Sequence, residues 1–164
     1  MSRDDARGRR QLSSRTVRLL RLLCVLIQCT WGLPQTLIGF ALFLLCRMRK
    51  RVSFSMGTAV CTEWNRRDGV SLGLFFFCPK NGGIHLHEYG HTFQSLMLGP
   101  LYLLLVSLPS LLWAGLPYFE RYRREKRAPY SRLWCEAWAD RLGNRYLYRP
   151  GLPPVRKNMR DEIN

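Results

Sequence analysis

Two long stretches of the chain carry no charged residue, and they dominate its hydrophobic pattern. The first runs from Leu22 to Cys46 and the second from Thr92 to Phe119. Both exceed the roughly 18 apolar residues that indicate a membrane-embedded segment. The pattern therefore predicts membrane-embedded helices rather than a simple soluble domain.

The first apolar run is interrupted near its middle by the sequence WGLP, which ends at Pro34. Proline inside a helix removes a hydrogen bond and kinks or breaks the helix. We therefore expect residues 18–47 to form a retained membrane anchor, either one kinked span or a short helical hairpin. Basic residues flank both ends, and because basic flanks mark the cytoplasmic side, they favour the hairpin.

Between the two runs the pattern changes to a period of two. Residues 52–57 alternate apolar with small or polar side chains, and residues 70–78 have the composition of a more buried strand. Turn signals occupy 65–69 and 79–83. The sequence thus predicts an α+β fold with a small antiparallel hairpin sheet of two or three strands.

Three helices are predicted after the sheet. Gly99 and Pro100 stop the first, Pro109 disturbs the second, and Ser131 and Gly143 bound the third. The predicted helices cover residues 86–98, 101–113 and 131–142.

The domain organisation follows from these segments. One domain is expected over 48–149, including the apolar helical segment 92–119. A basic disordered N-terminus, 1–17, and a flexible tail, 150–164, are expected to flank the rest. The charged run 120–127 is expected to be a solvated linker or a lipid-facing surface.

The chain is strongly basic, with 26 Lys and Arg against 11 Asp and Glu and a net charge of +15. This balance is typical of cytoplasmic membrane flanks and of contact with anionic lipid head groups or nucleic acid. Nucleic acid is disfavoured because no stripe of aromatic residues interleaves with Lys and Arg. The six cysteines form no CxxC pair. Cys61 and Cys78 can face each other across a hairpin, but free buried thiols are expected.

The sequence HEYGH, which begins at His87, contains an HExxH motif. On a helix, His87 and His91 lie on one face and can bind one metal ion. Glu88 can reach a metal-bound water instead of the metal and act as general base. His85 lies about 200° around a helix from His87, so it is expected to end the preceding strand near the site but off the metal.

A catalytic zinc site needs a third protein ligand. Glu136 and Asp140 share one face of the last predicted helix, so one can bind the metal while the other accepts a hydrogen bond from a ligand histidine. Cys135 is an alternative ligand, although thiolates are commoner in structural sites. Ala137 and Ala139 permit close approach of another helix.

HEYGH followed by EAWAD resembles the HExxH and ExxAD motifs of the gluzincin membrane proteases of the CAAX-prenyl-protease and HtpX heat-shock-protease group. The resemblance covers about residues 84–143. It implies that 48–149 is a zincin-like catalytic domain with a two-helix site for one zinc ion, a glutamate base and an aspartate that supports a ligand histidine. The implied zinc ligands are His87, His91 and Glu136, with Glu88 as the base and Asp140 as the support.

These features together predict an integral membrane zinc metallohydrolase, foremost a metallopeptidase acting on a peptide or a membrane protein. Because Glu136 must return to the histidines, the run 92–119 should be a re-entrant or in-plane hairpin that breaks at Gly99 and Pro100. The active site would then lie on the cytoplasmic face, where the strand 70–78 could offer its edge to a peptide. The alternatives are a zinc-binding membrane scaffold without turnover, and a basic protein that binds anionic lipid or nucleic acid at the membrane surface.

Overall fold

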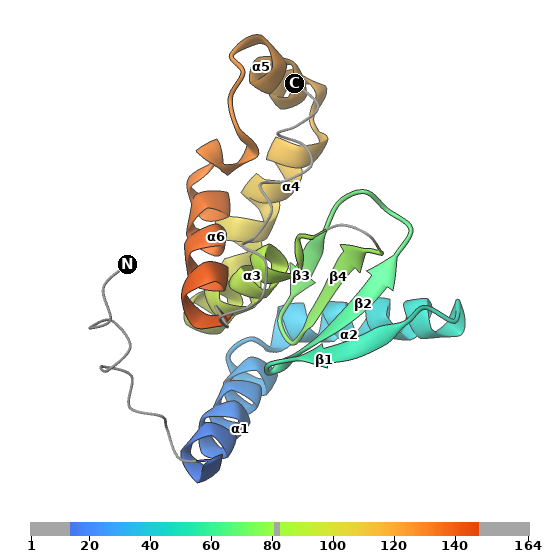
Figure 1. Cartoon of the computed structure of the whole chain (residues 1–164), viewed down its shortest axis with the longest axis vertical. Coiled ribbons are helices and arrows are strands. Elements are labelled where there is room, and N and C mark those ends of the chain that lie inside the picture. The colour runs from blue at the N-terminus through green and yellow to red at the C-terminus, as the bar shows by residue number, and fades with distance from the viewer. Residues whose placement is uncertain (1–13, 81–82, 148–164) are drawn as a thin grey trace, which may run out of the picture.

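The computed structural model describes residues 14–80 and 83–147, and these form an α+β fold of six helices and a four-stranded sheet, in which α4 and α5 extend away from the sheet (Figure 1). The predicted fold class is confirmed. The helices are α1 (Ser14–Thr30), α2 (Leu33–Met48), α3 (His85–Leu98), α4 (Leu108–Gly115), α5 (Pro117–Glu125) and α6 (Trp134–Leu147), with a π-helical turn η2 (Leu103–Ser107) and a 3-10 turn η3 (Tyr130–Arg132). The strands are β1 (Ser53–Met56), β2 (Ala59–Trp64), β3 (Val70–Leu72) and β4 (Phe75–Pro79). The predicted disorder over 1–13 and the tail 150–164 lie outside the described residues, whereas residues 14–17 belong to α1.

The sheet has the order β1-β2-β4-β3, and its central pair, β2 and β4, is parallel. The prediction of a purely antiparallel sheet of two or three strands is therefore wrong. The predicted strand 70–78 is divided at Gly73, whose φ of 65° suits glycine, into the antiparallel strands β3 and β4. β2 was not predicted because this inner strand is buried on both faces and lacks an alternating pattern.

Helices cover both faces of the sheet. On one face, the rings of Phe40 and Phe43 in α2 lie 5.8 and 5.3 Å from the ring of Phe75. On the other face, Phe76 makes an edge contact with Tyr89 of α3 at 6.2 Å. The core on the α3 side consists of Ala59, Cys61, Phe76, Cys78, Ile84 and Tyr89.

The first apolar run forms two helices, α1 and α2, that meet at an angle of 94°. Pro34 lies in the first turn of α2, where its missing N–H costs no hydrogen bond. In the described part of the chain, no single helix has the length and hydropathy needed to cross a membrane. Two pairs of consecutive helices have the needed length and hydropathy only when the two members are counted together. These pairs are α1 with α2, and 103–115 with α5, which meet at 71°.

The chain after α3 differs from the prediction in where it turns back. The π-helical turn η2 directly precedes Pro109, as expected where a proline disrupts regular helical bonding. Residues 120–125 of the charged run belong to helix α5 and not to a linker, and Arg124 pairs with Glu120 and Arg121 with Glu125 one turn apart. The alternative of a lipid-facing surface stays a prediction. The helical break predicted at Gly99 and Pro100 is confirmed, because α3 ends at Leu98, but the chain returns towards α3 only after α5 (Figure 1).

The last helix, α6, begins at Trp134 and continues through Gly143. The predicted helix, 131–142, therefore begins and ends too early in the chain. Its first two residues belong to the 3-10 turn η3 instead. A Cβ at position 143 would lie 2.1 Å from the carbonyl oxygen of Leu86 in α3. Gly143 thus allows close helix packing instead of ending the helix.

Candidate metal centre

The site is built where α3 and α6 pack against each other at very short range. A Cβ at position 90 would lie 2.0 Å from the carbonyl oxygen of Ala139, which is itself completely buried. Together with Gly143, these small residues let the two backbones approach. The close approach places the histidines of α3 directly against the first turn of α6.

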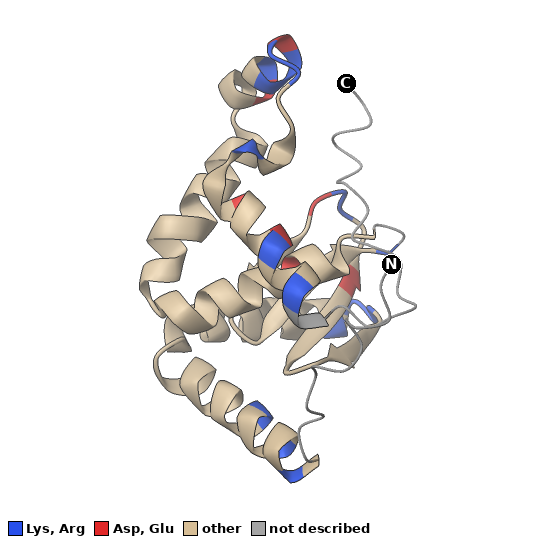
Figure 2. Cartoon of the chain, turned by 60° about the vertical axis from the view of Figure 1, so that its left-hand side comes forward, with Lys and Arg blue, Asp and Glu red and all other residues tan. Residues whose placement is uncertain are grey.

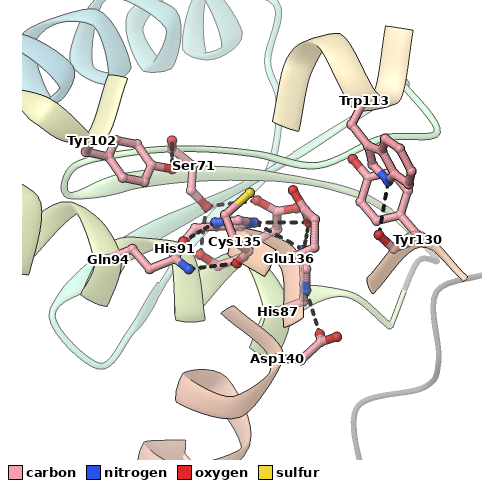
Figure 3. Close-up of polar contacts among 11 residues, drawn as sticks. Ser71, His87, His91, Gln94, Tyr102, Trp113, Tyr130, Cys135, Glu136 and Asp140 are labelled. Carbon is pink, nitrogen blue, oxygen red and sulfur yellow. Dashed lines mark hydrogen bonds and ion pairs between the residues drawn. The ribbon is translucent and has the colours of Figure 1, made fainter. Parts of the chain in front are cut away.

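Three side-chain atoms meet at this interface (Figure 3). His87 Nε2 lies 3.2 Å from His91 Nε2 and 3.0 Å from Glu136 Oε2, and His91 Nε2 lies 3.5 Å from the same oxygen. Ligands at 2.0–2.1 Å from a tetrahedral zinc ion are about 3.3 Å apart. The triangle therefore has the size of one face of a zinc coordination sphere, and these three buried residues could hold a metal ion.

The far ring nitrogens of both histidines have acceptors that set the tautomer. His87 Nδ1 lies 2.7 Å from Asp140 Oδ1, and His91 Nδ1 lies 2.6 Å from Gln94 Oε1. The Gln94 amide is oriented by its nitrogen, which donates to the carbonyl of Cys135 at 2.7 Å. Both Nδ1 atoms therefore donate, which leaves both Nε2 lone pairs directed at Glu136 (Figure 3).

Such an arrangement of lone pairs requires a cation or a proton at its centre. Burial disfavours a charged His87, but hydrogen bonds to Asp140 and Glu136 outweigh this effect and raise its pKa well above the usual value. Burial likewise raises the pKa of Glu136, but the charge of His91 and hydrogen bonds from both histidines hold it well below the usual range. The Oε1 atom of Glu136 is buried without a hydrogen-bond partner among the described residues. The donor set therefore fits a divalent cation.

Glu88 lies beside this triangle and is 5% exposed. The Ser71 hydroxyl lies 2.8 Å from its Oε2 atom and 2.7 Å from its backbone oxygen, and can donate to either. Burial raises the pKa of Glu88, and the charges of His91 and His87 oppose that rise. A Cβ at position 69 would lie 2.0 Å from Glu88 Oε1, so only glycine leaves room for this oxygen at that position.

A cavity of about 210 Å³ opens next to these groups. Strand β3, which is an edge strand of the sheet, forms one wall, and η2 and α4 form another. The Tyr102 hydroxyl spans the two walls by donating to the Ser71 carbonyl at 2.9 Å. Among the lining residues are His87, Glu88, His91, Glu136, Tyr102 and Leu111.

The remaining predicted site residues have different positions. His85 is the first residue of α3, so the prediction that it ends a strand is wrong. The side chain of Cys135 packs with Tyr102 and Val106 outside the triangle, and its backbone carbonyl accepts from Gln94. Gln94 was not predicted as a site residue, although it lies three residues after His91, where a helix brings side chains together.

Comparison of the chain with protein-family models, with curated proteins and with solved structures gives no match. The likeness to gluzincin membrane proteases therefore remains a prediction from the two motifs. The structure itself contributes the buried group of His87, His91 and Glu136, which has the geometry of a metal site.

Proposed function

We propose that this protein is a membrane-associated, zinc-dependent metallohydrolase, and specifically a metallopeptidase. The observation that carries the proposal is the convergence of His87, His91 and Glu136 beside Glu88 in one cavity. Two histidines and a glutamate, with a fourth position open, are the ligand set of catalytic zinc in peptidases such as thermolysin. A buried carboxylate next to that set is positioned for proton transfer.

The residues of the chain suit peptide hydrolysis. Bound zinc would supply a water molecule of lowered pKa and polarise the scissile carbonyl. Glu88 would take a proton at Oε1, the oxygen that Ser71 does not hold, and pass it to the leaving nitrogen. Ser71 holds the other oxygen, and burial raises the pKa of Glu88 so that it can carry a proton closer to neutral pH.

The substrate proposal rests on β3. This edge strand lines the cavity, so an extended peptide could pair with it and run past the metal site. The pairing position at Ser71 is partly occupied, because its carbonyl already accepts the Tyr102 hydroxyl. A peptide that pairs with β3 would have to displace this hydroxyl.

The proposal of membrane association rests on the polarity of α1 and α2. Their buried glutamines point inward, where Gln28 donates to the carbonyl of Thr92 and Gln35 donates to that of Gly99. Many apolar side chains instead face outward, a distribution that suits contact with lipid. Figure 2 shows basic residues at the N-terminal end of α1 and both basic and acidic residues on α5, with the uncharged segment of η2 and α4 between them. The basic end of α1 favours the cytoplasmic leaflet. The outward-facing residues include Leu22, Leu23, Leu26, Leu37, Leu44 and Leu45 on α1 and α2, and Leu104, Leu105 and Leu108 on η2 and α4.

Metal analysis joined to a cleavage assay tests the proposal. The full chain, purified in detergent, should bind zinc at the triangle and cleave members of an unstructured peptide library. Chelation should abolish cleavage, and added zinc should restore it. His87→Ala should lose both the metal of this site and activity. Zinc binding without cleavage of any peptide would favour the alternative of a zinc-binding scaffold.

A further inference from the structure

A second group of potential metal ligands lies on α3 and the sheet. It consists of Cys61 on β2, Cys78 on β4 and His85 at the start of α3, with one ligand atom of each within 4.8 Å of the other two. His85 and His87 are two residues apart, so their side chains leave the helix about 200° apart. The two groups are therefore separate.

The strand register places both thiols on one face of the sheet. Cys61 pairs with Phe76, and Cys78 pairs with Glu63 two residues along β2. Side chains at paired positions and at every second position point to the same face. The contact of Phe76 with α3 identifies this as the face that His85 adjoins.

The ligand atoms are buried and lie beside one another, and the Cys61 thiol interacts with both Cys78 and His85. Both sulfurs belong to free cysteines whose residues are completely buried. The Nε2 atom of His85 is also buried and has no hydrogen-bond partner within the described ranges. The hydroxyl of neighbouring Tyr89 instead accepts a hydrogen bond from the backbone N–H of Thr58. A buried ring nitrogen without a partner costs free energy, which a bound cation would recover.

We propose that Cys61, Cys78 and His85 bind a second zinc ion with a structural role. Thiolate and imidazole are the usual ligands of structural zinc, and a tetrahedral ion holds such atoms about 3.5–3.8 Å apart. The group can close onto an ion if its atoms approach by no more than about 1 Å. A water molecule can fill the fourth position.

Such an ion would join β2, β4 and the N-terminus of α3. It would thereby fix the start of the helix that carries His87 and His91, two and six residues further on. Metal binding to elements from separate parts of the chain stabilises the folded state, because the unfolded chain has no formed site.

Cobalt titration tests the proposal. The full chain is purified in detergent under reducing, anaerobic conditions, stripped with a chelator and titrated with Co²⁺. Cysteine ligation gives a thiolate-to-cobalt charge-transfer band in the near ultraviolet, which a site of two histidines and a glutamate cannot give. We expect the band in the wild type and in His87→Ala, and its loss in Cys61→Ser and Cys78→Ser. Cys135→Ser, which removes another completely buried thiol, is the matched control and should keep the band.

His85→Gln covers the case in which a cysteine variant fails to fold. His85 is only partly buried, and this variant keeps both thiols. It should retain the helix content of the wild type by circular dichroism but bind the thiolate-ligated cobalt at least about 10-fold more weakly. Absence of the band in the wild type, its survival in Cys61→Ser, or its loss in Cys135→Ser would overturn the proposal. A Cys61–Cys78 disulfide in place of bound metal in the freshly purified protein would also overturn it. Because His87→Ala should keep the band while losing the metal of the first site, the test of the second site does not depend on whether the protein is a peptidase.

Discussion

Gln94 and His91 are joined by a hydrogen bond of 2.6 Å between the glutamine Oε1 and the histidine Nδ1. This contact fixes the histidine tautomer that presents Nε2 to Glu136. Because the Gln94 amide is itself held by the Cys135 carbonyl, the glutamine links α6 to the orientation of a ligand on α3.

Gln94→Leu should weaken zinc binding at the triangle by about 10–100-fold, the usual cost of losing a hydrogen bond that orients a ligand histidine. Gln94→Glu keeps an acceptor for His91 and should lose less. Titration against a zinc buffer of known affinity measures both variants. Wild-type affinity in Gln94→Leu would show that the glutamine does not position His91.

Three substitutions on α6 should rank in a fixed order. Glu136→Ala leaves two protein ligands and should lose nearly all zinc affinity at this site. Asp140→Ala removes only the acceptor of His87 Nδ1 and should cost about 10–100-fold. Cys135→Ser should be nearly silent, because this sulfur lies outside the triangle. Metal loss in Cys135→Ser with retention in Glu136→Ala would contradict the ligand assignment.

Zinc affinity at the triangle should depend on pH through His87. Burial disfavours its charged form, but Asp140 and Glu136 raise its pKa well above the usual value, so a proton competes with the metal below that pKa. Affinity should therefore rise with pH by about tenfold per unit until His87 is neutral in the metal-free protein, and then level off. Asp140→Asn removes one cause of the raised pKa and should move the rise to lower pH. Zinc titrations of the wild type and Asp140→Asn across a pH series measure this shift. The same pH profile in both proteins would contradict this role of Asp140.

Tyr102→Phe tests whether peptides pair with β3. The substitution frees the Ser71 carbonyl, so a pairing peptide no longer has to displace the tyrosine hydroxyl. Because one such hydrogen bond contributes about 0.5–1.5 kcal/mol, KM should fall by about 2–10-fold with little change in kcat. Tyr118→Phe, which alters an exposed tyrosine, is the control. A higher KM in Tyr102→Phe would indicate that the hydroxyl contacts the substrate instead.

The sequence predicted those parts of the molecule that depend on local spacing. Residues four apart on a helix lie on the same face, and this spacing was sufficient to predict that His87 acts with His91 and Glu136 with Asp140. Ser71 could not be nominated, because its contact with Glu88 depends on how the sheet packs against α3. The parallel pairing of β2 with β4 was missed for a related reason: an inner strand lacks the alternation that marks a half-exposed strand. Helix α5 was not predicted, because its charged residues were interpreted as a solvated linker or a lipid-facing surface and not as pairs one helical turn apart.

The central claim is that Glu88 transfers a proton at a zinc site that it does not itself ligate. Zinc content and kcat/KM for peptide cleavage should be measured on the same preparations of wild type, Glu88→Gln and Glu120→Gln, the last altering an exposed glutamate of α5. Glu88→Gln should keep wild-type zinc and lose about 10²–10⁴-fold or more in kcat/KM, while Glu120→Gln matches the wild type in both. Substantial cleavage by Glu88→Gln, or loss of its zinc, would contradict the claim.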